Sequence, residues 1–340
     1  MLMKKLLYAT ASACALLISA PASAGYAGLY VFGDSLSDVG NFAAITPNPP
    51  SLPVKIPGPT TAYTLGRFTN GLNYVDYLAS DLGLSIAPSV LGGTDYAWGG
   101  ARTNSHALGA FASVLGQVAS FTALPGPANS LDLYIVFGGA NNTRDAIQSV
   151  LLGGSPSAAA LATQSAANDI MTAIQELYAE GARDFLVPNL PDLALTPAIN
   201  GLASPAASFV ANSLTNLFNS TLAADVVLLD TLHPDVDIHT LDTYAFLNNL
   251  VANAADLGFT NTTDRCYTGN DSNFSTPPSV APSLICANPD QYIFWDSIHP
   301  TSHTAVVFAQ AALAAVVPEP ATLALFGLGL ASLGFSRRKQ

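Results

Sequence analysis

The chain has 340 residues, half of them hydrophobic, which is enough for one large α/β domain or two smaller ones. Its formal net charge at pH 7 is -12, from 11 Lys and Arg against 23 Asp and Glu. Five of the 11 basic residues lie within a few positions of the two termini and the others are scattered, so the body offers no basic stripe for a phosphate backbone. Nucleic acid is therefore excluded as an expected partner.

The first 24 residues have the order of a secretory signal peptide. Lys4 and Lys5 precede an apolar run over 6–20, and small residues ending at Ala24 form a cleavage site. The alternative is a membrane anchor, which the shortness of the apolar run disfavours. We expect export, with cleavage after Ala24.

Between the termini, short apolar strands alternate with helices. Strands are expected at 28–32, 133–137, 184–188 and 226–229, and helices at about 158–180 and 206–223. The Pro-rich segment 46–61 is expected to be a surface loop. Such alternation predicts a parallel sheet covered on both faces, with the ligand at the carboxyl ends of the strands. We find no internal repeat and no interdomain linker.

The cysteines indicate an oxidised protein. Cys14 lies in the signal segment, which leaves Cys266 and Cys286 as an even pair in a chain bound for an oxidising compartment. We expect these two to form a disulfide. No CxxC spacing accompanies them, which argues against a metal site.

Ser35 lies in the strongest chemical motif of the chain, the segment 31–41 that ends the first expected strand. A serine where a strand turns into a helix exposes its hydroxyl at the sheet edge, and the helix N-terminus offers N–H groups to an anion. The alternative is that Ser35 or Ser37 only caps a helix. No Gly-x-Ser-x-Gly pentapeptide occurs, so the ordinary α/β-hydrolase elbow is not supported.

A serine nucleophile needs a base, and the base needs an orienting group. Of five histidines, only His299 follows a carboxylate, Asp296, by three residues in an aromatic-flanked turn. The next two residues, Pro300 and Thr301, suit a helix start and place His299 on the loop before it. A rival interpretation takes His299 and His303 as zinc ligands, but it lacks the Glu of H-E-x-x-H and any further ligand.

Two turns contain candidate donors for a developing oxyanion. The Gly-rich turn 96–101 offers the backbone N–H of Gly99 or Gly100, and Asn141 offers a side-chain amide after the second strand. Taken alone, both are ordinary turns.

The order of these motifs resembles the SGNH/GDSL hydrolase family: Gly-Asp-Ser-Leu at 33–36, a Gly block at 99–100, Gly-Ala-Asn at 139–141 and Asp-Ser-Ile-His at 296–299. The resemblance implies a three-layer α/β/α sandwich with a central, mainly parallel sheet of flavodoxin-like type over residues 25–316, without metal or cofactor. It also implies Ser35 as nucleophile, His299 as base and Asp296 as its orienter. The implied oxyanion donors are the Ser35 backbone, Asn141 and a glycine, for which we favour Gly100 over Gly99.

One residue departs from the family pattern, because Asn142 stands where the family usually has Asp. This leaves Asn141 in place and puts the support of its loop in question. The extended first block resembles the lipolytic branch, so we expect a lipase or esterase that acts on a small-molecule or lipid ester. The alternatives are a carbohydrate acetylesterase acting on surface polysaccharide and a non-catalytic surface or matrix protein that keeps the fold.

The last 24 residues, 317–340, form a second targeting segment. Val-Pro-Glu-Pro at 317–320 precedes an apolar stretch over 321–335 and the basic residues of 337–339. This tail resembles the PEP-CTERM sorting signal of Gram-negative bacteria. The resemblance implies export across the inner membrane to the cell surface or medium, with only transient membrane contact before exosortase-type processing; the alternative is a permanent anchor.

Overall fold

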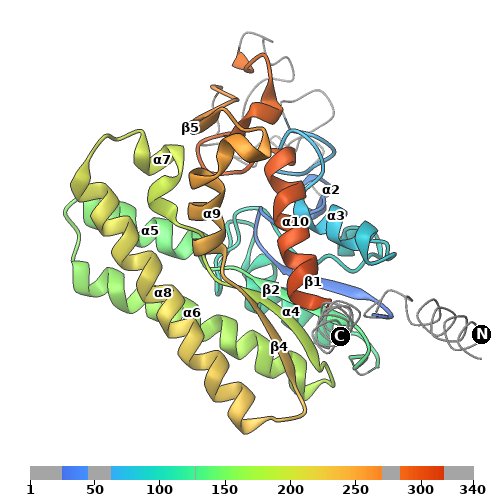
Figure 1. Ribbon diagram of the computed structural model, residues 1–340. Helices are drawn as coiled ribbons and strands as arrows, with labels where there is room; N and C mark the ends of the chain where they lie inside the picture. The colour runs from blue at the N-terminus through green and yellow to red at the C-terminus, as the bar shows by residue number, and fades with distance from the viewer. Residues whose placement is uncertain (1–24, 45–62, 127, 270–283, 318–340) are drawn as a thin grey trace, which may run out of the picture.

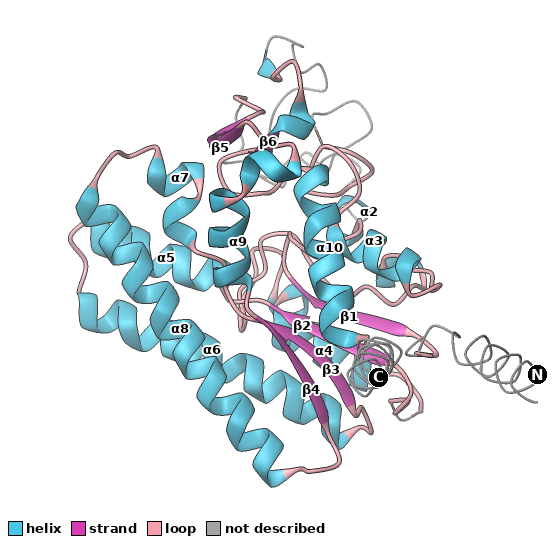
Figure 2. Cartoon of the chain, in the orientation of Figure 1, coloured by secondary structure: helices cyan, strands magenta, loops and turns pink. Residues whose placement is uncertain are grey.

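A parallel sheet with strand order β1-β2-β3-β4 runs through the centre of the computed structural model (Figures 1 and 2). The structure describes residues 25–44, 63–126, 128–269 and 284–317. The expected signal segment 1–24, the expected loop 46–61 and residues 318–340 of the tail lie outside them. The strands are β1 (Leu29–Gly33), β2 (Leu133–Phe137), β3 (Asp184–Pro188) and β4 (Asp237–Leu241), with a second parallel pair, β5 (Asn261–Arg265) and β6 (Tyr292–Phe294).

Helices connect the strands and cover both faces of the sheet (Figure 2). They are α2 (Asn41–Ala44), α3 (Tyr74–Asp81), α4 (Val114–Thr122), α5 (Ala140–Leu151), α6 (Pro156–Ala179), α7 (Pro197–Asn200), α8 (Pro205–Leu232), α9 (Thr243–Ala252) and α10 (Ser302–Val316). Among the described residues, no helix combines the length and apolar character needed to cross a bilayer.

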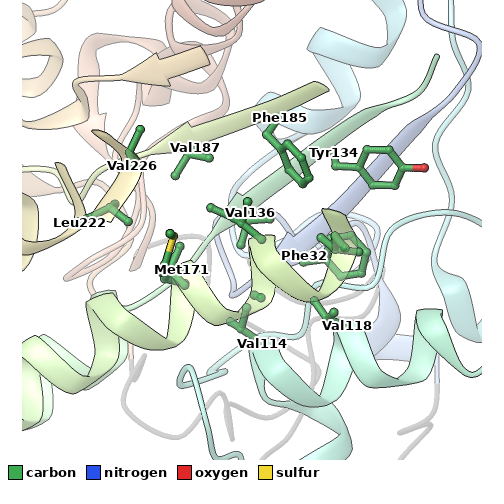
Figure 3. Packing of buried hydrophobic residues seen from close by; sticks show 14 of the residues in the cluster. Phe32, Val114, Val118, Tyr134, Val136, Met171, Phe185, Val187, Leu222 and Val226 are labelled. Carbon is green, nitrogen blue, oxygen red and sulfur yellow. The ribbon is translucent and has the colours of Figure 1, made fainter. Parts of the chain in front are cut away.

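One face of the sheet packs against α4, α6 and α8 (Figure 3). Alternate strand residues point into this layer because successive side chains of a strand face opposite sides. The residues labelled in Figure 3 are Phe32, Tyr134, Val136, Phe185 and Val187 from the strands and Val114, Val118, Met171, Leu222 and Val226 from the helices.

The other face packs against α3 and α10. Its strand residues include Val31, Ile135 and Leu186, which alternate with those of the first face. The inner strands are therefore buried on both sides, which explains why β2 reads as the continuous apolar run Leu-Tyr-Ile-Val-Phe. These layers confirm the expected three-layer α/β/α fold with a central parallel sheet.

The strand predicted at 226–229 is wrong, because these residues belong to α8. The β-branched and leucine-rich run continues a helical period in which Phe218, Leu222, Val226 and Leu229 all point into the core. No glycine or proline breaks the helix before Pro234. The fourth strand is instead β4, whose mostly polar sequence Asp-Ile-His-Thr-Leu gave a weaker signal.

β1 lies at the edge of the sheet, and its free side is closed by a loop and a side chain. The Val31 N–H donates to the Thr94 carbonyl at 3.1 Å, and the Tyr96 N–H donates to the Val31 carbonyl at 2.7 Å. The Gln117 amide then pairs with Gly33, accepting from its N–H and donating to its carbonyl, both at 2.8 Å. Gln117 therefore fixes the carboxyl end of β1.

The expected disulfide joins Cys266 and Cys286, which are 20 residues apart. Cys266 is buried in an aromatic cluster with Tyr63, Tyr267 and Trp295. In the chain-entropy model, closing a loop of this length stabilises the fold by roughly 3 kcal/mol. Because Trp295 adjoins Asp296, the bridge also braces the segment that contains the Asp-x-x-His turn.

We predict that Gln117→Met destabilises the protein by about 1–3 kcal/mol, because it leaves the buried Gly33 N–H without its acceptor while keeping side-chain volume. Urea unfolding measures the loss. Gln148→Met, at an exposed position on α5, is the matched control and should change stability little. A Gln117 variant as stable as the wild type would contradict this role.

Candidate active site

Ser35 lies in a turn at the carboxyl end of β1. The Asp34 carbonyl accepts hydrogen bonds from the N–H groups of Ser37 (3.1 Å) and Asp38 (3.0 Å), and the Ser35 side chain is almost fully buried. The helix expected directly after the serine does not form, since α2 begins only at Asn41. The reason is Asp38, whose carboxylate accepts the first N–H groups of α2 and so caps the helix at that later point.

His299 lies in the loop between β6 and α10, as expected. The Trp295 N–H donates to the His299 carbonyl at 2.8 Å, which closes the turn. Thr301 caps α10 by accepting a hydrogen bond from the Thr304 N–H, so the helix begins at Ser302. Inside the turn, Asp296 Oδ1 accepts from the N–H groups of Ile298 (2.9 Å) and His299 (2.7 Å).

Ser35, His299 and Asp296 form one hydrogen-bonded series although 264 residues separate the first two. His299 Nε2 lies 2.7 Å from Ser35 Oγ, and His299 Nδ1 lies 2.7 Å from Asp296 Oδ2. The exposed fractions are 8% for Ser35, 2% for His299 and 0% for Asp296. With Nδ1–H bound to the carboxylate, Nε2 is oriented to accept the serine proton.

The Asp296 carboxylate remains charged in spite of its burial. Burial alone would raise its pKa, but the charge of His299 and hydrogen bonds from His299 and Ile298 hold the pKa below its ordinary value. Tyr63 also donates its hydroxyl to Asp296 Oδ2 at 2.7 Å. Sequence reasoning missed Tyr63, since nothing in its local motif points to a residue 233 positions away.

The two candidate glycines differ in the use of their N–H groups. The Gly99 N–H donates to the buried Asp38 carboxylate at 2.8 Å. Among the described residues, the N–H groups of Gly100 and Ser35 have no hydrogen-bond partner. Gly100 has φ +82°, a conformation that favours glycine. This difference favours Gly100 over Gly99 as an available donor.

Asn141 lies on the first turn of α5, directly after β2. Its Nδ2 donates to the carbonyl of Ala101, the neighbour of Gly100, at 2.9 Å. An amide nitrogen carries two hydrogens, so one remains for another acceptor. The residue before α5 has to be glycine, because Gly139 has φ +104° and an added Cβ would lie 2.3 Å from the Phe218 ring.

Asn142 supports the neighbouring loop in spite of its departure from the family pattern. Its Oδ1 accepts from the Thr103 N–H at 3.0 Å, and its Nδ2 donates to Thr103 Oγ1 at 3.3 Å. Arg144, half-buried one turn further along α5, donates to Asn141 Oδ1 at 3.3 Å. Both ends of the Asn141 amide are therefore held.

Three buried carboxylates surround the turn that contains Ser35. Burial raises the pKa of Asp34 to about 6, against the lowering effects of the Leu36 N–H and the charges of His299 and Arg144. Burial also raises the pKa of Asp95, and the neighbouring charge of Asp38 raises it further. Asp38 accepts four backbone N–H groups, so it is the member of this pair better suited to hold the charge.

Two adjoining cavities open beside the Ser35–His299 pair. The smaller, about 20 Å³, is lined by Ser35 and Phe68, and the larger, about 100 Å³, begins at Asn141. His299 and Leu36 border both. The remaining lining of the larger cavity is mostly apolar: Phe137, Ala140, Pro191, Leu193, Phe246, Leu247, Ile293, Phe294, Ile298, Pro300 and Phe308, with Arg144, Thr196, Thr243 and Thr304.

The zinc interpretation of His299 and His303 does not fit the geometry. Both ring nitrogens of His299 face Ser35 and Asp296, whereas His303 Nδ1 lies 2.6 Å from the Asp290 carbonyl. In the described part of the chain, one group could present three metal ligands: Asp184, Asp237 and His239. Asp184 and Asp237 are the first residues of β3 and β4, and His239 is the third residue of β4, so the group lies toward the amino ends of these strands, whereas Ser35 follows the carboxyl end of β1.

A serine, a histidine and an aspartate in hydrogen-bonded series are an arrangement that serine hydrolases of different folds share. The family model of the GDSL-like lipases and acylhydrolases matches residues 29–312. The chain belongs to this family, as its motifs predicted, and the protein is a hydrolase of ester bonds.

Two plant GDSL esterase/lipases agree with this assignment. A GDSL esterase/lipase of Arabidopsis thaliana is 30% identical over 84% of this chain and 81% of its own length. A second from the same plant is 28% identical over 86% of this chain and 88% of its own length. Among solved structures, a GDSL-like lipase from Parabacteroides merdae covers 88% of this chain and 98% of its own, with a TM-score of 0.44 and 12% identity.

The C-terminal tail has a match of its own. The PEP-CTERM protein-sorting motif matches residues 316–339, which confirms the resemblance noted in the sequence. The motif indicates export in a Gram-negative bacterium, to the surface or the medium, with processing related to an exosortase.

The raised pKa of Asp34 predicts a pH-dependent stability. Because this carboxyl titrates near 6 in the folded protein and near 3.8 when unfolded, the folded state binds more protons between those values. Asp34 therefore lowers stability progressively as pH rises from about 4 to about 6. Asp34→Asn keeps an oxygen for the Leu36 N–H and removes this penalty, so the variant should gain roughly 2–3 kcal/mol on the wild type across that range.

Urea unfolding of the two proteins at pH 4, 5, 6 and 7 measures the difference. Asp256→Asn, at an exposed position, is the matched control. A difference between Asp34→Asn and wild type that stays constant over this pH range would contradict the prediction.

Proposed function

We propose that the protein is an exported carboxylic-ester hydrolase that works through an acyl-enzyme formed on Ser35. The observation that carries the proposal is the hydrogen-bonded series Ser35–His299–Asp296, with 2.7 Å at both links. An active enzyme needs this series intact, which favours catalysis over a non-catalytic surface protein that only keeps the fold. In this proposal the secreted domain is 25–316, between a signal peptide over 1–24 and the sorting tail over 317–340.

In the first half of the reaction, Ser35 Oγ attacks the ester carbonyl carbon while His299 Nε2 takes the serine proton. Asp296 holds the imidazole and stabilises its charged form. The negative charge that develops on the carbonyl oxygen is met by the N–H groups of Ser35 and Gly100 and by Asn141 Nδ2. Losing one such donor typically reduces the rate by roughly 10²–10³-fold.

When the tetrahedral intermediate collapses, the bond to the alcohol oxygen breaks and His299 returns its proton to that oxygen. A water molecule then attacks the acyl-Ser35 carbonyl, again giving a proton to His299. Collapse of the second intermediate releases the carboxylic acid, and the proton returns to Ser35 Oγ. The cycle needs no cofactor to balance its atoms.

The larger cavity favours an acyl chain as the group bound beside the triad. Its lining between Asn141 and His299 is made mostly of aliphatic and aromatic side chains, which stabilise apolar groups by burial. A lipase or esterase therefore fits this site better than a carbohydrate acetylesterase, whose sugar needs hydrogen-bonding side chains.

Ser35→Ala should reduce ester hydrolysis by roughly 10⁴-fold or more, because it removes the attacking oxygen. The assay is p-nitrophenyl butyrate hydrolysis, with circular dichroism to verify folding. Ser37→Ala is the matched control: its hydroxyl lies 2.9 Å from the Tyr74 hydroxyl, away from His299, and most activity should survive. Normal turnover in a folded Ser35→Ala protein would disprove the nucleophile assignment.

Esters of butyrate and longer acids should be cleaved with higher kcat/KM than acetate esters, because their chains bury apolar surface in the larger cavity. A p-nitrophenyl series from C2 to C16 tests this. Leu247→Trp should shift the preference toward shorter chains, since Leu247 lines that cavity, whereas Leu257→Trp at an exposed position should leave it unchanged. A preference for acetate that Leu247→Trp does not alter would favour an acetylesterase instead.

A further inference from the structure

Tyr63 connects a distant segment of the chain directly to the Asp296 carboxylate. Its hydroxyl donates to Asp296 Oδ2 at 2.7 Å, and both residues are buried, with exposed fractions of 3% and 0%. The same oxygen accepts from His299 Nδ1. Tyr63 is therefore linked through the Asp296 carboxylate alone to the His299 imidazole, which faces Ser35.

The hydrogen bonds of Asp296 divide into two kinds. Oδ1 accepts the N–H groups of Ile298 and His299, and Oδ2 accepts His299 Nδ1, so these three donors belong to the same four-residue turn. Within the described ranges, Tyr63 is the one donor to Asp296 from outside the turn. It ties the turn to a separate part of the fold.

The Tyr63 ring is held by packing that does not depend on its hydroxyl. It meets the rings of Tyr267, Trp295 and Phe68 edge to face, with centroids 5.7 to 6.5 Å apart. The same aromatic cluster contains Cys266 of the disulfide. Because the ring is fixed in this way, the hydroxyl can be removed without displacing the side chain.

We propose that Tyr63 is a positioning residue of the triad, and that its hydroxyl anchors Asp296 Oδ2 and shares the negative charge that this oxygen presents to the His299 imidazole. The inference rests on the proposed function of Ser35, His299 and Asp296. The hydroxyl shares the negative charge of the carboxylate through a charge-assisted hydrogen bond. With the hydroxyl present, the carboxylate acts less strongly on the imidazolium.

Two further charged groups interact electrostatically with Asp296 or His299. Asp34, on the turn after β1, lies close enough to His299 for their charges to interact, and Arg144 on α5 interacts with both Asp296 and Asp34. None of these groups changes when Tyr63 loses its hydroxyl. The Asp296 charge then acts more fully on the His299 imidazolium and stabilises it.

The test compares pH profiles of kcat/KM for wild type, Tyr63→Phe and Tyr77→Phe, each recorded below its melting temperature. In Tyr63→Phe the rising limb should move to higher pH by about 0.5–1 unit, a ~3–10-fold loss on the acid side, with a smaller loss on the alkaline plateau. Tyr77→Phe is the matched control, since its hydroxyl lies 2.9 Å from Ser302 Oγ and does not touch the triad. Its limb should stay in place.

An unmoved limb in Tyr63→Phe would overturn the proposal, whether activity is unchanged or falls equally at every pH, because uniform loss indicates only structural damage. A double variant, Tyr63→Phe with Asp296→Asn, gives an independent check. If Tyr63 acts through the Asp296 charge, the limb shift should vanish in that background, and a shift that persists would also overturn the proposal. Failure of the proposed triad is recognised separately, by normal turnover of Ser35→Ala.

Discussion

Parallel pairing of β1 with β2 is the constraint on which the rest of the site depends. The register places Gly33 beside Phe137, so the chain leaves both strands at the same edge of the sheet. Two residues after Gly33 comes Ser35, and four residues after Phe137 comes Asn141. A parallel pair needs a long crossover, and here it places a serine and an amide at the same edge of the sheet although about a hundred residues separate them.

Buried hydrogen-bond acceptors hold the loops at this edge of the sheet, and each acceptor joins a different pair of segments. Asp38 binds the first N–H groups of α2 together with that of Gly99, so one carboxylate joins the turn after Ser35 to the loop that contains Gly100. Asn142 joins that loop to α5 through Thr103. Burying carboxylates is unfavourable unless they are hydrogen-bonded. The pKa of Asp34 is raised because its hydrogen bond and the nearby positive charges offset only part of the unfavourable desolvation.

Much of this could be predicted from the sequence, because its signals are local. Three strands were recognisable as apolar runs, and Ser35, His299 and Asp296 stand in contiguous motifs whose order resembles a family. The strand prediction for 226–229 was wrong because β-branched residues are compatible with a buried helix when the helical period continues through them. Gln117 and Tyr63 could not be found in this way, since each acts on a residue 84 or 233 positions away. Only tertiary packing brings such partners together.

The two ends of the described chain meet at the edge of the sheet opposite the triad. The Tyr26 hydroxyl lies 3.1 Å from the carbonyl of Val316, the last residue of α10, and 3.1 Å from Asp184 Oδ1 at the start of β3, and its single hydrogen can bond either oxygen. Any membrane attachment through the segments beyond these residues would therefore hold the protein at the side of the sheet where the strands have their amino ends. The triad, at the carboxyl ends of the strands, would then lie on the far side of the sheet from that attachment. Release of the tail would change how far the enzyme travels and leave the direction of the site on the fold unchanged.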